Sequence, residues 1–423
     1  METTLYAVSG TAIVAVLVWL LLSNAARPER RLQRRPDRLY GSETPDFRRA
    51  FGSLLGPSIV GGNRIRTLQN GDAIFGAMLD AIGRARASVT FEQFIFRDEI
   101  GLAFCNALTD AAKRGVEVRV LLDWVGAKEV EADALDCLRD SGAQVELYHQ
   151  PALRHLGRLN NRTHRKLMVV DGRFGYTGGA CVGREWTGDA QDPEHWRDTH
   201  YEVEGPVVAQ MQSAFVDNWI KTSGTVLHGD RYFPKLAHAG DAEAQMLLSS
   251  PAGGANSMHL MILLALTAAQ RSIDIENSYF VPDELAMDAL IAARRRGVRV
   301  RIVTPNHHTD AKLGRWATHG LYQPLLDAGV EIYEYQPTMI HCKVLVVDGH
   351  WCTVGSANFD NRSFRLNDEA NLNVFDRAFA AEQVAIVEAD LQQCVRITPS
   401  RWRARPFGKR LYERTALLLR SQL

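Results

Sequence analysis

The sequence predicts an α/β protein built from two duplicated lobes, and two observations carry that prediction. The pattern H-x-K-x-x-x-x-D occurs twice, at His164–Asp171 and at His341–Asp348, and the two histidines are 177 residues apart. Around each copy, segments with helical apolar spacing alternate with segments typical of strands. A shared offset over such a length indicates an internal repeat, and alternating strands and helices are typical of layered α/β folds.

The first repeat begins with a predicted helix–strand–helix–strand unit. Ala73–Ala85 has helical spacing, and Ser88–Phe96 alternates as a strand does. Ile100–Arg114 again has apolar residues at helical spacing and stops at Gly115, a residue type common directly after helix ends. Val116–Leu122 is then the second strand.

The second repeat follows the same order. Its predicted elements are a helix at Met258–Gln270, a strand at Ser272–Glu276, a helix at Glu284–Arg296 and a strand at Val298–Ile302. Gly297 ends the second helix as Gly115 ends its counterpart, and the offset of 182 residues is close to that of the motif histidines. One duplication therefore explains both halves.

An uncharged stretch precedes the repeats. Thr3–Ala26 contains no charged residue, and twenty-four helical residues span about 36 Å, enough to cross a bilayer. Arginines cluster directly after it, which by the positive-inside rule places the body of the protein in the cytoplasm. A cleaved signal peptide is the alternative, because Ser23–Ala25 resembles a cleavage site, but the usual basic segment before the apolar stretch is missing.

Composition divides the chain into five predicted parts. They are a transmembrane anchor at 1–26, a basic juxtamembrane linker at 27–58, lobes at 59–240 and 241–400, and a basic C-terminal tail at 401–423. The tail mixes Arg and Lys with Leu at roughly helical spacing, so it either packs against the body, which we favour, or lies on a membrane surface.

Charge and cysteines exclude some functions. The 49 basic and 49 acidic residues cancel, so net charge gives no support to a nucleic-acid partner. The six cysteines form no C-x-x-C pair and have no zinc-ligand spacing, which favours buried free thiols in a reducing compartment. We expect no metal and no cofactor.

The repeated motif has a chemical reason. In a strand, positions two apart share a face, which would place His341 beside Lys343. An imidazole that transfers protons next to a fixed ammonium suits attack on a phosphate ester. A single copy is more simply a buried histidine beside a lysine, whereas two copies favour function. Asp171 and Asp348 complete the motifs, but their parity and their Asp-Gly turns predict that they hold the turn more than they contact phosphate.

At these motifs the sequence resembles the phospholipase D superfamily, and within it the bacterial cardiolipin synthases. The resemblance covers about residues 60 to 423. Besides the two motifs it rests on Phe91–Asp98, Gly157–Arg162, Trp196–His200, Tyr279–Asp283 and Asn361–Ser363. It implies a phospholipase D-like fold of two α/β lobes related by a pseudo-two-fold axis, with one active site that uses both lobes, in a protein of the bacterial inner membrane.

The resemblance also implies roles for individual residues. His164 would attack phosphorus to form a phosphohistidine, and His341 would protonate the leaving alkoxide and then deprotonate the acceptor alcohol. Lys166 and Lys343 would hold the non-bridging oxygens, with Asn358 as a further donor.

Acidic partners and one departure complete the expected site. Asp198 and Glu369, each about thirty residues after its motif histidine, match the family's acidic residues, which fix the histidine tautomer. Each motif is followed by a short segment, Gly178–Cys181 or Gly355–Asn358, and in the family the first segment usually ends with Asn where this chain has Cys181. A thiol is a weak donor, so the first half should contribute less to holding phosphate.

The implied reaction is transfer of a phosphatidyl group between two phosphatidylglycerol molecules, which gives cardiolipin and releases glycerol. A phospholipase D hydrolase or another phosphatidyltransferase shares every catalytic residue and differs only in the acceptor. A membrane-tethered nuclease or other phosphodiesterase of the superfamily would need a basic groove with aromatic side chains. A non-catalytic membrane scaffold would leave the two H-x-K pairs unexplained.

Overall fold

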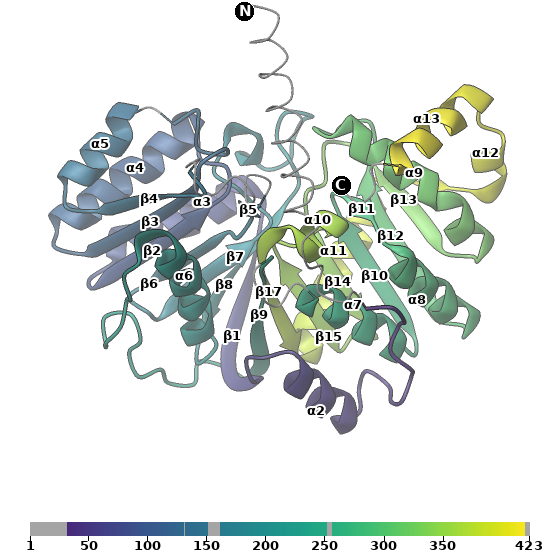
Figure 1. Cartoon of the computed structure of the whole chain (residues 1–423), viewed down its shortest axis with the longest axis horizontal. Helices are drawn as coiled ribbons and strands as arrows, with labels where there is room; N and C mark the ends of the chain where they lie inside the picture. Colours follow the sequence, from purple (N-terminus) through teal and green to yellow (C-terminus); the bar gives the residue numbers. More distant parts are fainter. Residues whose placement is uncertain (1–31, 131, 151–160, 252–255, 419–423) are drawn as a thin grey trace, which may run out of the picture.

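One mixed β-sheet runs through both halves of the chain in the computed structural model, and helices pack against it (Figure 1). The structure describes residues 32–130, 132–150, 161–251 and 256–418. The strands of the first half are β1 (Val60–Gln69), β2 (Ser88–Gln93), β3 (Glu117–Asp123), β4 (Gln144–Tyr148), β6 (Leu167–Val170), β7 (Phe174–Gly178) and β8 (Thr199–Glu204). Those of the second half are β9 (Ala242–Ser249), β10 (Ser272–Asn277), β12 (Arg299–Pro305), β13 (Glu331–Tyr335), β14 (Lys343–Val347), β15 (Trp351–Gly355), β17 (Asn367–Phe375) and β18 (Cys394–Ile397).

The strand order shows the duplication. From the centre outwards, the first half runs β1-β8-β7-β6-β2-β3-β4, and the second half runs β9-β17-β15-β14-β10-β12-β13, with β18 added at its edge. Each position in one series matches the same position in the other, and the innermost strands β1 and β9 pair antiparallel. The motif strands β6 and β14 therefore occupy equivalent places.

Helices cover the two faces of the sheet in the same way in each half. In the first half they are α3 (Asn70–Arg84), α4 (Asp98–Lys113), α5 (Ala132–Asp140) and α6 (Val208–Ser223). In the second half they are α7 (Ser257–Ala268), α8 (Glu284–Arg295), α9 (Lys312–Asp327) and α11 (Arg377–Leu391). Alternation along β6 separates the faces: Met168 packs with the residues of α3 and α4, whereas Val169 packs with those of α6.

Local signals explain where several helices begin and end. Asp283 and Asp376 cap α8 and α11, each accepting a hydrogen bond from a backbone N–H three residues later. Gly115 and Gly297 follow α4 and α8 with φ of +89° and +90°, a conformation that glycine adopts without strain. The helix ends predicted at these two glycines are confirmed.

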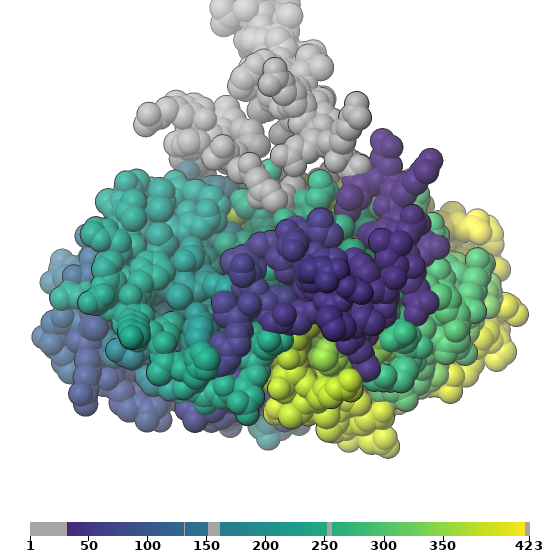
Figure 2. Space-filling model, turned by 90° about the horizontal axis from the view of Figure 1, so that it is seen from below, coloured from purple at the N-terminus to yellow at the C-terminus, as the bar shows by residue number. Residues whose placement is uncertain are grey.

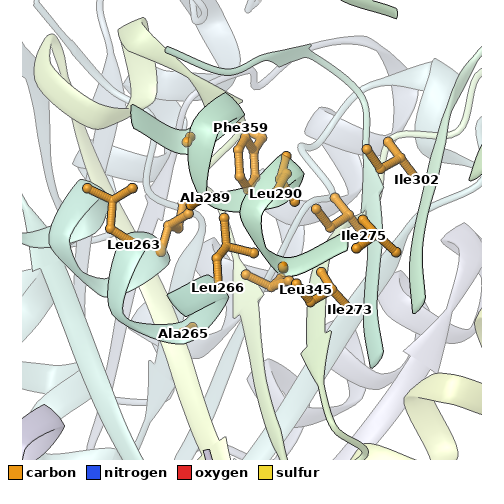
Figure 3. Packing of buried hydrophobic residues seen from close by; sticks show 14 of the residues in the cluster. Leu263, Ala265, Leu266, Ile273, Ile275, Ala289, Leu290, Ile302, Leu345 and Phe359 are labelled. Atoms are coloured by element: carbon orange, nitrogen blue, oxygen red, sulfur yellow. The ribbon is translucent and has the colours of Figure 1, made fainter. Parts of the chain in front are cut away.

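The core of the second half contains α7, which is apolar on all sides. Leu263 and Leu266 of this helix are buried against Leu290 of α8, Ile275 of β10 and Leu345 of β14 (Figure 3). A helix without a polar face is stable only when it is covered all round. Its packing against Leu345 therefore helps to fix the position of β14 and of His341, which precedes that strand.

The segment expected as a linker is partly folded onto the body, which corrects that expectation. Pro45–Leu54 forms α2, whose residues Phe47 and Phe51 are buried against Trp351 and Phe375 of the second half. Seen from below, this part of the chain (purple) lies across the body (Figure 2). Phe47 and Phe51 are one helical turn apart, so both point at the core.

The C-terminal residues form two helices, α12 (Pro399–Arg403) and α13 (Phe407–Leu417), which pack against α9. The packing favoured for the tail is thus observed for its described residues. No helix in the described ranges is long and apolar enough to span a membrane. The expected anchor at 1–26 lies outside those ranges.

Candidate active site

The two motif histidines directly precede the equivalent strands β6 and β14, and the backbone of each is held by the other half of the chain. The N–H of His164 donates to the carbonyl of Asp368 at 2.9 Å, and the N–H of His341 donates to the carbonyl of Arg197 at 2.7 Å. The short strand β5 (Arg162–Thr163) pairs in parallel with the start of β17 in the same region. These backbone contacts place each histidine next to the acidic residue that follows its partner.

His164 contacts Glu369. Nδ1 of His164 lies 3.0 Å from both carboxylate oxygens of Glu369, which is fully buried. Ser356 Oγ donates to the same carboxylate at 2.5 Å, and the Asn367 amide donates at 3.3 Å. Burial opposes ionisation of Glu369, but the electrostatic attraction of the His164 ring, its hydrogen bond and the charge of Lys166 together outweigh burial and lower the pKa of the carboxyl.

His341 contacts Asp198 in the equivalent arrangement in the other half of the site. Nδ1 of His341 lies 2.7 Å from Oδ2 of Asp198, and the indole N–H of Trp186 donates to that oxygen at 3.0 Å. The N–H of Thr199 donates to the other oxygen at 2.8 Å. Burial raises the pKa of Asp198 to about 6 despite the charge of Lys343. Each imidazole thus has its Nδ1 bound to a carboxylate, which leaves Nε2 as the atom for chemistry.

The two motif lysines are buried beside the histidines. Lys166 Nζ donates to the carbonyl of His164 at 2.8 Å, and Lys343 Nζ donates to that of His341 at 2.6 Å. Lys343 Nζ also lies 3.0 Å from Nε2 of His341 and donates to Ser278 Oγ at 2.7 Å. In the second motif the spacing by two residues therefore brings the ammonium to the ring, whereas in the first motif the contact is with the backbone carbonyl of the histidine.

Burial and these ammonium groups change the titration of the site. Burial lowers the pKa of Lys343 to about 8. Burial, with the positive charge of Lys166 added, lowers the pKa of His164 to about 4, and burial with Lys343 holds that of His341 well below its usual value. In the free protein both imidazoles are therefore neutral near pH 7, and a neutral imidazole is the form that can act as nucleophile or base.

The segments that follow the two motifs, Gly178–Cys181 and Gly355–Asn358, end in different residues. Oδ1 of Asn358 accepts from Ser278, which joins the amide to Lys343 through one hydroxyl. Cys181 is the equivalent residue of the first half, and burial raises the pKa of its thiol. A Cβ on Gly179 would lie 2.2 Å from the Asp198 carboxylate, so this position cannot carry the hydroxyl that Ser356 supplies in the other half.

Asp171 and Asp348 lie at the far ends of the motif strands from the histidines. The Asp171 carboxylate accepts from the N–H groups of Ala87 and Ser88, and the Asp348 carboxylate accepts from those of Arg271 and Ser272. Both have positive φ, +53° and +55°. Their contacts are those of residues that hold a turn, and they do not reach the histidines.

Several site residues were not singled out from the sequence. Trp186 lies in a 3-10 turn without a motif. Phe94 lies within Phe91–Asp98, a segment that carries the resemblance, but the proximity of its ring centroid to that of His164, 5.2 Å, was not predicted; strand β2 ends at Gln93, before the predicted end at Phe96. Ser278 directly precedes the segment Tyr279–Asp283, so a search of the flanks of that segment could have found it. Tyr279 itself donates to Asp310 and lies edge-on to His341.

Comparison with known proteins places this geometry in a family. The family model described as "Cardiolipin synthase, PLD-like domain" matches residues 78–215 and 262–391. These ranges contain both crossed pairs, in which the histidine of one half contacts the acid of the other: His164 with Glu369, and His341 with Asp198. Cardiolipin synthase A of Pseudomonas aeruginosa (strain LESB58) is 37% identical over 340 residues, covering 80% of this chain and 69% of that protein. The major cardiolipin synthase ClsA of Bacillus subtilis (strain 168) is 34% identical over 361 residues, covering 84% and 75%.

A solved structure supports the fold. Phosphatidylserine synthase of Haemophilus influenzae Rd KW20 superimposes with a TM-score of 0.70 over 89% of this chain and 100% of that chain, at 14% identity. The duplicated sheet, the two motifs and the similarity to cardiolipin synthases all indicate the same family. The chain belongs to the cardiolipin synthase family of phospholipase D-like proteins.

Proposed function

We propose that this protein is a cardiolipin synthase, a phosphatidyltransferase that joins two phosphatidylglycerol molecules and releases glycerol. The observation that carries the proposal is that two histidine–carboxylate contacts, His164–Glu369 and His341–Asp198, each join one half of the chain to the other. Two-step transfer through a covalent intermediate needs one nucleophile and one proton carrier, and this pairing supplies both. The family relationship specifies the chemistry as phosphatidyl transfer.

In the first step, the lone pair on Nε2 of His164 attacks phosphorus. A P–N bond forms while the P–O bond to glycerol breaks, and His341, protonated on Nε2, gives its proton to the leaving oxygen. The bound phosphodiester anion favours that protonated state because it offsets the lysine charges that lower the pKa of His341. Lys166 and Lys343 bind the non-bridging oxygens as charge develops.

In the second step, the now neutral His341 removes the proton from the hydroxyl of a second phosphatidylglycerol. The hydroxyl oxygen attacks phosphorus, the P–N bond breaks, and His164 returns to its neutral form with cardiolipin as product. Glu369 and Asp198 keep the proton of each ring on Nδ1 throughout, so that Nε2 stays directed at the phosphate. Lobes at 59–240 and 241–400 each supply one histidine and one acid to this cycle.

The acceptor decides between synthase and hydrolase, so the experiment measures products. Purified full-length protein is incubated with labelled phosphatidylglycerol in vesicles, and the lipids are separated by chromatography. Labelled cardiolipin that disappears in His341→Ala is the expected result. Phosphatidic acid alone would mean that water is the acceptor and that the protein is a phospholipase D.

Membrane association is part of the proposal. A lipid substrate agrees with the uncharged stretch Thr3–Ala26, which is long enough to anchor the chain, and with the arginines that follow it. Reporter fusions after residue 60 test the topology. Activity of a cytoplasmic reporter is expected, and activity only of an exported reporter would refute a cytoplasmic catalytic body.

A further inference from the structure

A cavity of about 540 Å³ lies away from the two motif histidines, at the outer end of the second half. Figure 1 shows its walls, the hairpin of α12 and α13 (yellow) beside α9, far from β5 and α10 (Asn361–Arg365) in the middle of the molecule. Its charged lining consists of Arg315, Arg401, Arg405, Lys409, Glu334 and Glu413. Four cations against two carboxylates leave a net positive charge.

The carboxylates of the cavity already have partners, whereas several donors do not. His319 lies 2.8 Å from Glu334, and Arg405 lies 3.1 Å from Glu413. Within the described part of the chain, no acceptor meets Nε of Arg315, Nε or Nη1 of Arg405, or the indole N–H of Trp402, although all are buried. Buried donors without partners cost free energy, so an anion with several oxygen acceptors would stabilise this cluster.

The geometry of Arg405 suits a phosphate. Its guanidinium lies over the ring of Trp402, 3.2 Å from the centroid, which fixes the plane of the donors. A planar guanidinium held in this way keeps its two unpartnered donors, Nε–H and Nη1–H, in fixed directions on either side of the Nη2 that pairs with Glu413, and charge-assisted donors of this kind bind phosphate oxygens.

Exposed apolar side chains gather around the cavity, and Trp316, Val395 and Tyr412 among them line it. Seven of the thirteen large hydrophobic side chains that are exposed in the described residues belong to α9, α13 and the strand and turn next to them: Leu313, Trp316, Val395, Phe407, Leu411, Tyr412 and Leu418. Phe407 (72% exposed), Leu411 (52%) and Leu418 (81%) lie on one side of α13, since they are spaced by four and seven residues. Arg410 and Arg414 are also on this helix. An apolar stripe with basic residues is typical of a helix that lies in a membrane interface.

We propose that the α9–α12–α13 cavity binds the phosphate headgroup of an anionic phospholipid, with the exposed side of α13 inserted among the acyl chains. This site would be separate from the catalytic one and would hold the second half of the protein against the bilayer. A lipid is favoured over a free phosphate ester because the cavity that holds the donors is also lined by the exposed apolar side chains of Trp316, Val395 and Tyr412.

Photo-crosslinking tests the site in the full-length protein in nanodiscs. Phosphatidylglycerol and phosphatidylcholine, each with a diazirine near the headgroup, are compared, and labelled peptides are mapped by mass spectrometry. We expect the anionic probe to label peptides containing Trp316 or Tyr412. Arg405→Gln combined with Lys409→Gln should lower this labelling roughly tenfold, the loss expected for charge-assisted hydrogen bonds.

Controls separate the site from folding and from catalysis. Arg403→Gln changes a cation on the same hairpin that pairs with Asp327 and does not line the cavity, so labelling should persist. Lys409→Gln alone, at an exposed position, covers the case in which the double variant does not fold. His341→Ala should lose transfer activity and keep the labelling. Equal labelling by both lipids, undiminished labelling in the folded double variant, or full competition by sn-glycerol 3-phosphate would overturn the proposal.

Discussion

His341 and Asp198 come from different halves of the chain, yet Nδ1 of His341 lies 2.7 Å from Oδ2 of Asp198. The reverse pair, His164 and Glu369, is equally close, at 3.0 Å. Neither half therefore holds a complete histidine–carboxylate pair: each supplies a histidine that contacts the acid of the other half. These contacts form because β6 and β14 occupy equivalent positions in the one sheet that both halves share.

The two crossed pairs predict that the carboxylates of Glu369 and Asp198 are needed for a high kcat. Glu369→Gln and Asp198→Asn should each lower kcat by roughly 10² to 10⁴, because an amide can stabilise the wrong tautomer of its histidine. KM should change little, since neither carboxylate touches phosphate in the proposed cycle. Initial rates of cardiolipin formation over a range of phosphatidylglycerol concentrations measure both constants.

Glu194→Gln is the matched control for this prediction. Glu194 is exposed and only four residues before Asp198, so the variant should retain wild-type kcat. A loss expressed as KM alone in Glu369→Gln would place that carboxylate in substrate binding and not in orientation of His164.

The two histidines should differ in their dependence on the leaving group. A phosphatidyl ester of p-nitrophenol needs no proton to depart, so His341→Ala should still release one equivalent of p-nitrophenol in a burst and then stop as a phosphohistidine at His164. His164→Ala should show no burst. Stopped-flow absorbance and mass spectrometry of the trapped peptide measure these outcomes. A phosphohistidine at His341 in His164→Ala would reverse the assignment.

The pKa of Lys343 predicts an alkaline limit to activity. Burial lowers this pKa to about 8, so Nζ is charged below that pH and loses its charge, and its hold on the phosphate oxygens, above it. The pH profile of kcat/KM should therefore fall above about pH 8. Lys343→Arg, whatever its absolute rate, should not show this fall because a guanidinium stays charged. An unchanged alkaline limb in Lys343→Arg would assign it to another group.

The sequence predicted the repeat, both histidines and both lysines, because these are read from residue types at fixed spacing, and the family resemblance added the two acids. It could not say which acid meets which histidine. Spacing along the chain places Asp198 after His164 and Glu369 after His341, whereas the sheet places them crosswise. Pairing between halves depends on how β1 meets β9, a long-range register that no local pattern contains.

Packing explains the other difference. The arginine-rich composition of residues 27–58 resembles that of a linker, but two aromatic side chains in Pro45–Leu54 are enough to bury α2 against the second half. A short amphipathic stretch obtains its stability from the surface that it meets, and the sequence does not display that surface. For the same reason Trp186, which contacts Asp198 from a 3-10 turn, carried no signal.

The unequal ends of the two motifs predict unequal effects of truncation. Asn358→Ala should lower kcat/KM at least tenfold, because it removes the amide joined to Lys343 through Ser278. Cys181→Ala removes a buried neutral thiol and should cost mainly packing, with kcat/KM within about threefold of wild type. The same vesicle assay, with circular dichroism to verify folding, compares them. Equal losses in both variants would mean that the first motif holds phosphate as strongly as the second.

Because α2 is buried against the second half, substitutions of its buried side chains should lower the free energy of unfolding, which substitutions in a solvated linker would not do. The Phe51 side chain is fully buried, and its ring centroid is 5.5 Å from those of Trp351 and Phe375. Phe51→Ala should lower the free energy of unfolding by about 3 to 5 kcal/mol, the usual cost of removing a buried aromatic ring. Leu54→Ala, in the same helix but 58% exposed, should change it by only about 0.5 kcal/mol. Guanidinium unfolding of the full-length variants in detergent measures both, and equal midpoints would mean that α2 is not part of the cooperative fold.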